Sequence, residues 1–491
     1  MSILKKLAGQ TAIYGLSSIL GRFLNFFLTP IHTTALSKFD YGVNSDIYSL
    51  IAFLMVIFTF GMETTFFRFF SKKENAQQGN QIFSHTLFPV LSISLVFILL
   101  MLLFLPQVAG IMKYEEHPEY PIYMVLIVMM DAIAAVPFAK LRAQNKALKF
   151  VSIRISQILI FVLLNVFIFS ICPWLISKDI LTSFIQQIYH PEWGVAYIFI
   201  ANIIANGVML LLLLPTFKGF SFRLNWSLEK KYLLYATPLV IAGFAGIANE
   251  MLDRQFLKYL LPEGRAFEEI AMYGANYKIA TFMMMFIQAF RFAAEPFFFA
   301  QAKEENPKKM YAQILKFFTL FQSVIFVGLV CFIDVVKIFI DPKYWEGLYL
   351  APLLLFANLL VGINMNLNIW YKLEDKTRYG AYITFTGFAV TVGLNLLLIP
   401  KYEILGAAIA TLLSYASMTA YAYYLNQKHY HTPYPIARIF TYLLSGIALA
   451  YLSFAHLREN FLASSAIVLT YLLLLYLLEK KDIQKLLKHD K

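Results

Sequence analysis

Runs of about 20 apolar residues recur along the whole chain, separated by short polar segments. A helix rises about 1.5 Å per residue, so each run can cross a hydrocarbon core about 30 Å thick. The pattern therefore predicts an all-α integral membrane fold with fourteen transmembrane helices. The predicted spans are 8–34, 43–70, 82–106, 121–141, 150–172, 194–216, 232–259, 271–298, 312–333, 348–371, 379–400, 405–425, 436–455 and 461–478.

The composition supports a membrane protein. Of the 491 residues, 59% are hydrophobic and 14% are charged, whereas an ordinary globular domain carries about 25% charged residues. The N-terminus has the positive flank of a signal peptide, but no small-residue cleavage site follows, so the first apolar run is predicted to stay as a helix. The two cysteines lack the spacing of metal ligands, and no metal site is predicted.

The basic residues collect in alternate loops, which fixes the predicted orientation. The loop that joins the fourth and fifth spans carries Lys140, Arg142, Lys146, Lys149 and Arg154 with no acidic residue. Such loops lie on the cytoplasmic side, so both termini are predicted to be cytoplasmic. The net charge of +12 thus belongs to loops rather than to one basic domain, and nucleic-acid binding is not expected.

Two parts of the chain repeat the same residues at one offset of 232 positions. The matching residues are Arg22 and Arg254, Tyr41-Gly42 and Tyr273-Gly274, and Glu63 and Glu295. A long hydrophobic repeat indicates duplicated membrane lobes, and an even number of spans in each half places the symmetry axis along the membrane normal. The predicted organisation is a six-helix lobe over 1–217, a second over 218–426, and two added helices with a basic tail over 427–491.

Several polar residues lie inside the predicted spans, where a charge costs about 2.5 to 3.5 kcal/mol and usually marks function. Arg22 and Arg254 would stand at equal depth on opposite walls of a central cleft, because they are equivalent in the repeat. Arginine suits a diphosphate, since its planar fork can form two hydrogen bonds and keeps its charge when desolvated. The predicted residues for an anionic headgroup are Arg22, Asn25, Arg254, Lys278, Gln288 and Arg291.

Six acidic residues in the spans are candidates for a gate or for ion coupling. Asp46 and Lys278 are equivalent in the repeat, so they are expected to bridge the two lobes at the outer gate. Alternatives stay open: Arg254 could pair within its helix, Arg291 could pair with Glu295, and Lys278 could extend to the membrane surface. The acidic candidates are Asp46, Glu63, Asp131, Glu250, Asp253 and Glu295. Of these, the two glutamates equivalent in the repeat could instead fix nearby basic loops, and Asp131 could couple a cation.

The chain resembles the polysaccharide-biosynthesis flippases, the O-antigen-type branch of the multidrug/oligosaccharidyl-lipid/polysaccharide exporter superfamily. The resemblance rests on the 6 + 6 + 2 arrangement of spans, Arg22 in the first, and the Tyr-Gly pair that precedes the second and opens the eighth. It implies two lobes in a V, alternating access, and an undecaprenyl-diphosphate-linked glycan as substrate. It also implies that Arg22, Arg254, Lys278 and Arg291 meet the diphosphate or acidic sugars, and that other polysaccharide-assembly proteins are partners.

Two other functions remain as alternatives. A cation-coupled multidrug antiporter of the same fold would favour acids over bases in the cavity. A membrane polysaccharide polymerase or ligase would need catalytic groups on a large outer loop, and the longest predicted outer connection is 173–193. No Walker-type glycine loop is present, so the expectation is a transporter without ATP or another cofactor, with H⁺ or Na⁺ coupling left open.

Overall fold

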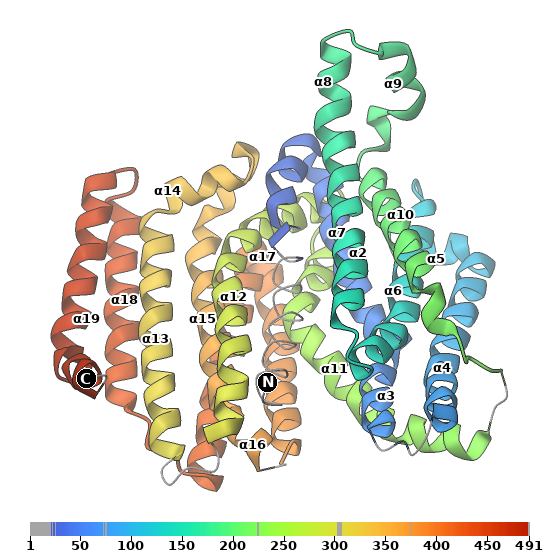
Figure 1. Cartoon of the computed structure of the whole chain (residues 1–491). Helices are drawn as coiled ribbons and strands as arrows, with labels where there is room; N and C mark the ends of the chain where they lie inside the picture. The colour runs from blue at the N-terminus through green and yellow to red at the C-terminus, as the bar shows by residue number, and fades with distance from the viewer. Residues whose placement is uncertain are drawn as a thin grey trace. The chain divides into compact units, whose positions relative to one another are not determined.

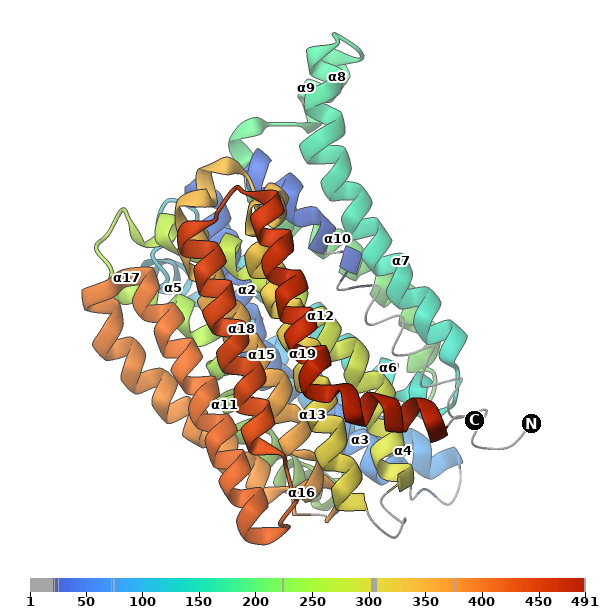
Figure 2. The same cartoon turned by 90° about the vertical axis from the view of Figure 1, so that its left-hand side faces the viewer.

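Helices make up all the regular structure that the computed structural model describes (Figures 1 and 2). It describes residues 21–489 except 22, 25, 72, 74, 75, 223, 224, 302–306 and 375. By compactness the chain forms two units, Met1–Ala271 and Met272–Lys491. The predicted boundaries at 217/218 and 426/427 rest on the sequence repeat, a different criterion, and stay a prediction.

The first unit holds ten numbered helices after a helical segment at 26–35. They are α2 (Lys38–Thr59), α3 (Met62–Phe70), α4 (Ala76–Leu103), α5 (Leu105–Ile111), α6 (Glu119–Ala143), α7 (Ala147–Val166), α8 (Cys172–Ser177), α9 (Thr182–Ile188), α10 (Ala196–Leu213) and α11 (Trp226–Leu260). Helix α6 is central, because it packs against α2, α3, α4 and α10. Helix α11 packs against α2 in the same unit.

The second unit contains most of α12 (Ala266–Gln301) and all the later helices. They are α13 (Pro307–Cys331), α14 (Ile333–Val336), α15 (Ala351–Leu367), α16 (Ile369–Leu373), α17 (Arg378–His429), α18 (Ile436–His456) and α19 (Phe461–His489). Helix α15 packs against α13 and α17, and α13 also packs against α18 and α19. The last two helices, predicted to lie outside the repeat, are therefore attached to this unit through α13.

Eleven described helical segments are long and apolar enough to cross a membrane. They differ from the fourteen predicted spans at three places. Most of the predicted span 8–34 lies outside the described residues, and α12 is helical but is not among the eleven. The label α17 covers both predicted spans 379–400 and 405–425, and its backbone leaves the helical conformation between them, at Glu403 with φ 49° and ψ −128°. The count of fourteen stays a prediction.

The connection 173–193, the longest of the predicted outer connections, contains two short helices. Helix α7 continues through a π-helical turn at Phe167–Ile171 into α8, and α9 follows after a turn (Figure 1). The continuous helical stretch Ala147–Ser177 has 31 residues. Its length is about 46 Å, so its end extends beyond a hydrocarbon core of about 30 Å.

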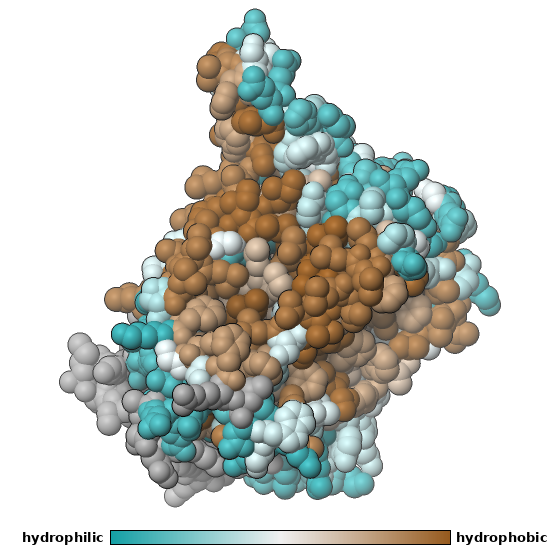
Figure 3. Space-filling view, turned by 90° about the vertical axis from the view of Figure 1, so that its right-hand side faces the viewer, coloured by the Kyte–Doolittle hydropathy of each residue, from teal (hydrophilic) through white to brown (hydrophobic). Residues whose placement is uncertain are grey.

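Apolar side chains gather on the molecular surface as expected for contact with lipid. Figure 3 shows a broad hydrophobic area on one face, with hydrophilic residues above and below it. Helix α4 alone exposes six large aliphatic side chains: Leu95, Val96, Leu99, Leu100, Leu102 and Leu103. A soluble protein rarely exposes so large an apolar patch, whereas a membrane helix turns such residues toward lipid tails.

Ion pairs fasten the α18–α19 hairpin to the rest of its unit at both of its ends. Near one end, Lys316 of α13 contacts Glu479 at 2.6 Å and Asp482 at 2.5 Å, and Arg438 of α18 contacts the same two carboxylates. Near the other end, Arg458 in the hairpin turn contacts Asp334 of α14 at 3.2 Å. The hairpin is therefore held by charges as well as by apolar packing.

We expect the Asp334 contact to make stability depend on acidity. Burial alone would raise the pKa of Asp334, but hydrogen bonds and charges from Lys337 and Arg458 lower it below the usual 3.8. A carboxylate with a lowered folded-state pKa stabilises the fold above the unfolded pKa, and this stabilisation is lost as the pH falls through the folded pKa. The midpoint temperature of thermal unfolding in detergent should therefore decrease when the pH is lowered below about 4.

The unfolding temperature of the variant Asp334→Asn should decrease less than that of the wild type over the same pH range, because the variant carries no titrating carboxylate at this position. At neutral pH the substitution should cost about 1 kcal/mol or less, since the contact is partly exposed. Equal acid sensitivity of the variant and the wild type would show that Asp334 does not contribute.

Candidate functional site

Arg254 lies at a buried position of α11 and pairs with its sequence neighbour. Its Nη1 contacts Asp253 Oδ1 at 2.9 Å and donates to the Glu250 carbonyl oxygen at 3.1 Å. The sequence left open whether Arg254 pairs within its helix or meets a substrate, and the intrahelical pair is present. The Glu250 side chain is exposed. The neighbouring carboxylate fixes the guanidinium.

Asp46 of α2 is the centre of a buried polar group in the first unit. It forms an ion pair with Lys258 of α11, and the side chains of both residues are fully buried. The Tyr114 hydroxyl donates to Asp46 Oδ2 at 2.5 Å, and Gln255 Nε2 donates to Oδ1 at 2.7 Å. The carboxylate therefore has a cationic partner within its own unit. The expected bridge from Asp46 to Lys278 joins residues of different units and stays a prediction.

Glu63 of α3 forms an ion pair with Arg142 near the end of α6. Arg142 belongs to the basic loop that the sequence assigns to the cytoplasmic side, and its guanidinium also lies over the Phe67 ring at 4.8 Å. Of the alternatives for Glu63, the geometry favours fixing this basic loop.

Asp131 of α6 lies in a network of polar side chains from α7 and α10. It accepts hydrogen bonds from Gln157 and Asn206, and the Arg154 charge acts on it. Arg154 Nη1 donates to Gln157 Oε1 at 2.9 Å, and Gln157 Nε2 donates to Asn206 Oδ1 at 2.5 Å. Amide donors from α7 and α10 and one guanidinium therefore surround this carboxylate, which can exchange a proton.

Three of the residues predicted for the headgroup lie on the part of α12 that belongs to the second unit. Lys278 and Arg291 are exposed, and Gln288 is half-buried. Arg291 lines a small pocket together with Lys372 of α16 and Asn366 of α15. Arg291 and Lys372 are the two cations among the described residues that line it.

Three predicted site residues lie outside the described part of the structure. Arg22 and Asn25 are not described, and neither is the side chain of Glu295. The predicted arrangement of Arg22 and Arg254 on opposite walls therefore stays a prediction, as does a pair between Arg291 and Glu295.

The Tyr-Gly pair of the sequence repeat has a packing role. Tyr41 and Tyr273 are both buried, at 2% and 0% exposure. A Cβ atom at Gly42 would lie 1.9 Å from the Phe267 carbonyl oxygen, so only glycine lets α2 approach the start of α12 this closely.

Sequence reasoning missed Lys258, Arg142 and Lys372. Each lies near a predicted helix end, where a basic residue is readily assigned to a loop. One signal could have found the first of them: Lys258 lies four residues after Arg254, so the two share a face of α11.

Comparisons with known proteins give one family match and several structures with a similar fold. A family model described as "Polysaccharide biosynthesis protein" matches residues 7–301. No curated protein matches the chain significantly.

Several solved structures share the fold. The lipid II flippase MurJ, in an inward closed conformation, aligns with a TM-score of 0.72 and 14% identity over 98% of this chain and 100% of that chain. A multidrug resistance MATE family transporter of the MOP superfamily aligns with a TM-score of 0.59 and 12% identity, over 85% and 95% of the two chains. A MOP superfamily transporter from Pyrococcus furiosus aligns with a TM-score of 0.57 and 10% identity, also over 85% and 95%.

These identities are low, so the likeness shows the fold alone: a multi-pass helical membrane protein of the kind seen in flippases and transporters. The family model, by contrast, covers more than half of the chain. The chain belongs to the polysaccharide biosynthesis protein family.

Proposed function

We propose that the protein flips an undecaprenyl-diphosphate-linked oligosaccharide from the inner to the outer leaflet of a bacterial cytoplasmic membrane. The glycan would serve surface polysaccharide such as the O-antigen of lipopolysaccharide. The family match supports this proposal. The observation that carries it is this family match over residues 7–301, and Arg291 of α12 and Lys372 of α16, which line one small pocket, are the candidate cations for the diphosphate.

The volume of this pocket is about 10 Å³, so a diphosphate would enter it only in a state of the transport cycle in which it is wider. Arg291 can form paired hydrogen bonds with phosphate oxygens, and Lys372 adds a second positive charge. The Asn366 side chain is buried, and its Oδ1 has no hydrogen-bond partner among the described residues, so it could accept a bond from a sugar hydroxyl. By the predicted topology this pocket lies toward the cytoplasm, where the substrate would be loaded.

Alternating access would carry the headgroup across while the lipid tail stays in hydrocarbon. A negative cell interior favours outward movement of an anion by about 2.3 kcal/mol per charge per 100 mV. Where the cavity cations neutralise the diphosphate, the voltage acts instead on the return of the empty, positive carrier. Either scheme permits net export without ATP.

We further propose that Asp131 takes up a coupling H⁺ or Na⁺. Gln157 and Asn206 hold its carboxylate by hydrogen bonds, and Arg154 would restore the charge balance when the cation leaves. The same network supports the runner-up function, a cation-coupled multidrug antiporter, because the fold is shared with MATE transporters.

Arg291→Gln and Lys372→Gln should each reduce translocation about tenfold or more, because each removes a hydrogen bond to a charged group. The measurement is the accumulation of undecaprenyl-diphosphate oligosaccharide facing the cytoplasm in cells depleted of the wild type and complemented by each variant. Arg291→Lys should recover part of the activity, since it keeps the charge and loses the paired hydrogen bonds.

Lys376→Gln is the matched control, because Lys376 is a partly exposed lysine close to Lys372 in sequence and does not line the pocket. Depletion without accumulation of the lipid-linked glycan, together with drug hypersensitivity, would contradict the flippase and favour the antiporter.

A further inference from the structure

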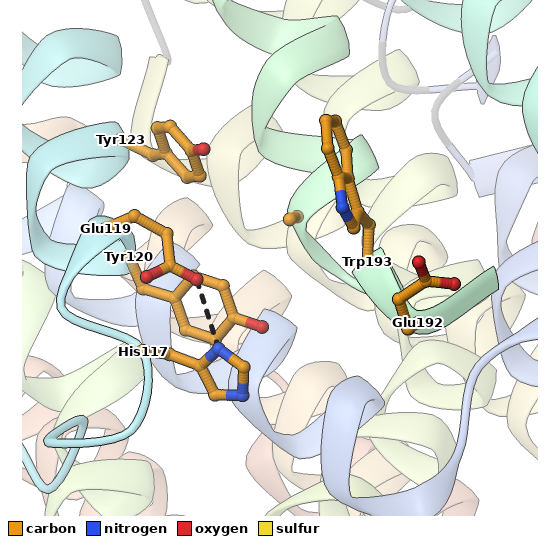
Figure 4. Close-up of a pocket in the computed structure, with 7 residues that line it drawn as sticks. His117, Glu119, Tyr120, Tyr123, Glu192 and Trp193 are labelled. Atoms are coloured by element: carbon orange, nitrogen blue, oxygen red, sulfur yellow. Dashed lines mark hydrogen bonds and ion pairs between the residues drawn. The ribbon is translucent and has the colours of Figure 1, made fainter. Parts of the chain in front are cut away.

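A second pocket lies in the first unit, at the start of α6 and α10 (Figure 4). Its volume is about 200 Å³. It is lined by His117, Glu119, Tyr120, Tyr123, Glu192, Trp193 and Ala196. By the predicted topology, the segments that carry these residues face the outside of the membrane, opposite the side where Arg291 and Lys372 lie.

The local backbone fixes Trp193 at the pocket. The turn Pro191–Trp193 ends at Gly194, whose φ of +42° is one that other residues rarely adopt. A Cβ atom at Gly194 would also lie 3.0 Å from Asp40 Oδ2, so the turn packs directly against the start of α2. The Tyr197 hydroxyl accepts a hydrogen bond from the His190 backbone N–H at 2.7 Å. Trp193 is therefore held on a braced turn.

Aromatic rings form two sides of the pocket. Tyr123 and Trp193 stand on opposite sides of it (Figure 4). Tyr120 does not offer an open face, because the His117 ring stacks on it with centroids 4.7 Å apart and an interplanar angle of 9°. The pocket is thus a slot between two aromatic side chains, rather than a cage closed on three sides around a cation.

The polar groups at the slot can accept hydrogen bonds from hydroxyl groups. His117 Nδ1 contacts Glu119 Oε1 at 3.0 Å, which orients this carboxylate (Figure 4). The Glu192 side chain is 70% exposed and lies 3.6 Å from His190. No lysine or arginine is among the described residues that line the pocket. Two carboxylates without a cation disfavour a diphosphate or an acidic sugar.

A neutral sugar ring matches this combination. The C–H groups of its two faces are apolar and weakly positive, so they pack against aromatic faces, which carry the negative part of the ring quadrupole. Its hydroxyl groups lie around the ring edge, where they can donate to carboxylates in strong charge-assisted bonds. The volume is smaller than that of a typical drug-sized site, as expected for one sugar unit.

We propose that this slot binds a neutral sugar residue of the glycan on the outer side of the membrane. The role rests on the proposed flippase function: the slot would hold the glycan after translocation and disfavour its return. The slot recognises the sugar, whereas the pocket at Arg291 and Lys372 would recognise the diphosphate.

The test is saturation-transfer NMR on the purified full-length protein in detergent. The probes are methyl glucoside, methyl N-acetylglucosaminide, glucuronate and choline. At least one neutral sugar should bind, and glucuronate and choline should bind more weakly. Trp193→Ala and Glu119→Gln should each weaken the binding of that sugar about tenfold. Glu192→Gln should weaken it less, since that carboxylate is mostly exposed and its removal should not disturb folding.

Two control variants separate the slot from the surface around it. Trp174→Ala removes another exposed tryptophan of the same unit, and Glu263→Gln removes an exposed glutamate, and neither residue lines the pocket. Both should bind the sugar as the wild type does. The proposal is overturned when no neutral sugar binds, when choline binds more tightly than the sugars, or when Trp193→Ala binds like the wild type.

These outcomes differ from failure of the flippase function. If the protein binds neutral sugars but its depletion does not cause lipid-linked glycan to accumulate, the sugar-binding slot is supported and the flippase function is contradicted. A protein whose depletion does cause accumulation, but that binds no neutral sugar, would lose the slot alone.

Discussion

Lys258→Met should destabilise the protein by about 3 to 5 kcal/mol, because it leaves the Asp46 carboxylate buried without its cation. The remaining donors, Tyr114 and Gln255, are neutral and cannot replace the lost charge. Burial first, and then the Asp46 charge, raises the pKa of Tyr114 well above its usual value, so its hydroxyl stays protonated as a donor. The measurement is the midpoint of thermal unfolding in detergent.

The double variant Asp46→Asn, Lys258→Met should recover most of the lost stability. It removes both charges together and keeps an amide oxygen that can accept from Gln255. Lys113→Met is the control, because Lys113 contacts the exposed Glu263 at 3.5 Å and such a pair is worth at most about 1 kcal/mol. A double variant as unstable as Lys258→Met would show that the neutral pair packs poorly, and that the single loss is not an effect of unpaired charge.

Transport by the same double variant separates a structural role from a gating role. Asp46 and Lys258 join α2 to α11 at ends that the predicted topology places on the outer side. A pair that only stabilises the unit should give back transport when stability returns. If the pair must break and reform in each transport cycle, transport should not recover in the double variant, because the neutral pair no longer favours the closed arrangement. The transport rate, normalised to the amount of folded protein, decides between them.

The helices could be predicted from the sequence because each is defined by local hydrophobicity. The predicted span 121–141, for example, lies within α6, Glu119–Ala143. Pro400 and the polar residues after it predicted a break between two spans. In the structure Pro400 is helical, and the backbone leaves the helical conformation three residues later, at Glu403, between the two predicted spans. Local sequence therefore marked the place of this break to within a few residues, because proline disfavours a continuous helix.

The partners of the buried charges could not be predicted in the same way. The repeat proposed Lys278 as a partner of Asp46 across the two units, and that bridge stays a prediction. The structure pairs Asp46 with Lys258, which lies 212 positions away in sequence, and Glu63 with Arg142, 79 positions away. Residues at equivalent positions of a repeat are related by duplication of the sequence, whereas an ion pair forms between residues that the packing of helices brings together.

The second large effect concerns Lys316, which holds the carboxylates of α19 against α13. Lys316→Met should cost about 3 kcal/mol, the low end for a broken buried pair, because Arg438 still contacts the fully buried Glu479 at 3.0 Å. The loss should appear as a lower unfolding midpoint and as faster proteolysis in the connection 430–435 before α18, at the end of the hairpin that Lys316 holds.

Arg438→Met is the matched control, since Arg438 contacts the same two carboxylates as Lys316. Its side chain is 47% exposed, whereas that of Lys316 is 4% exposed. Water screens the exposed guanidinium, so its removal should cost about 1 kcal/mol or less. The difference between the two variants then measures burial alone. Equal losses would mean that the network acts as one unit, in which neither cation can be removed without releasing Glu479.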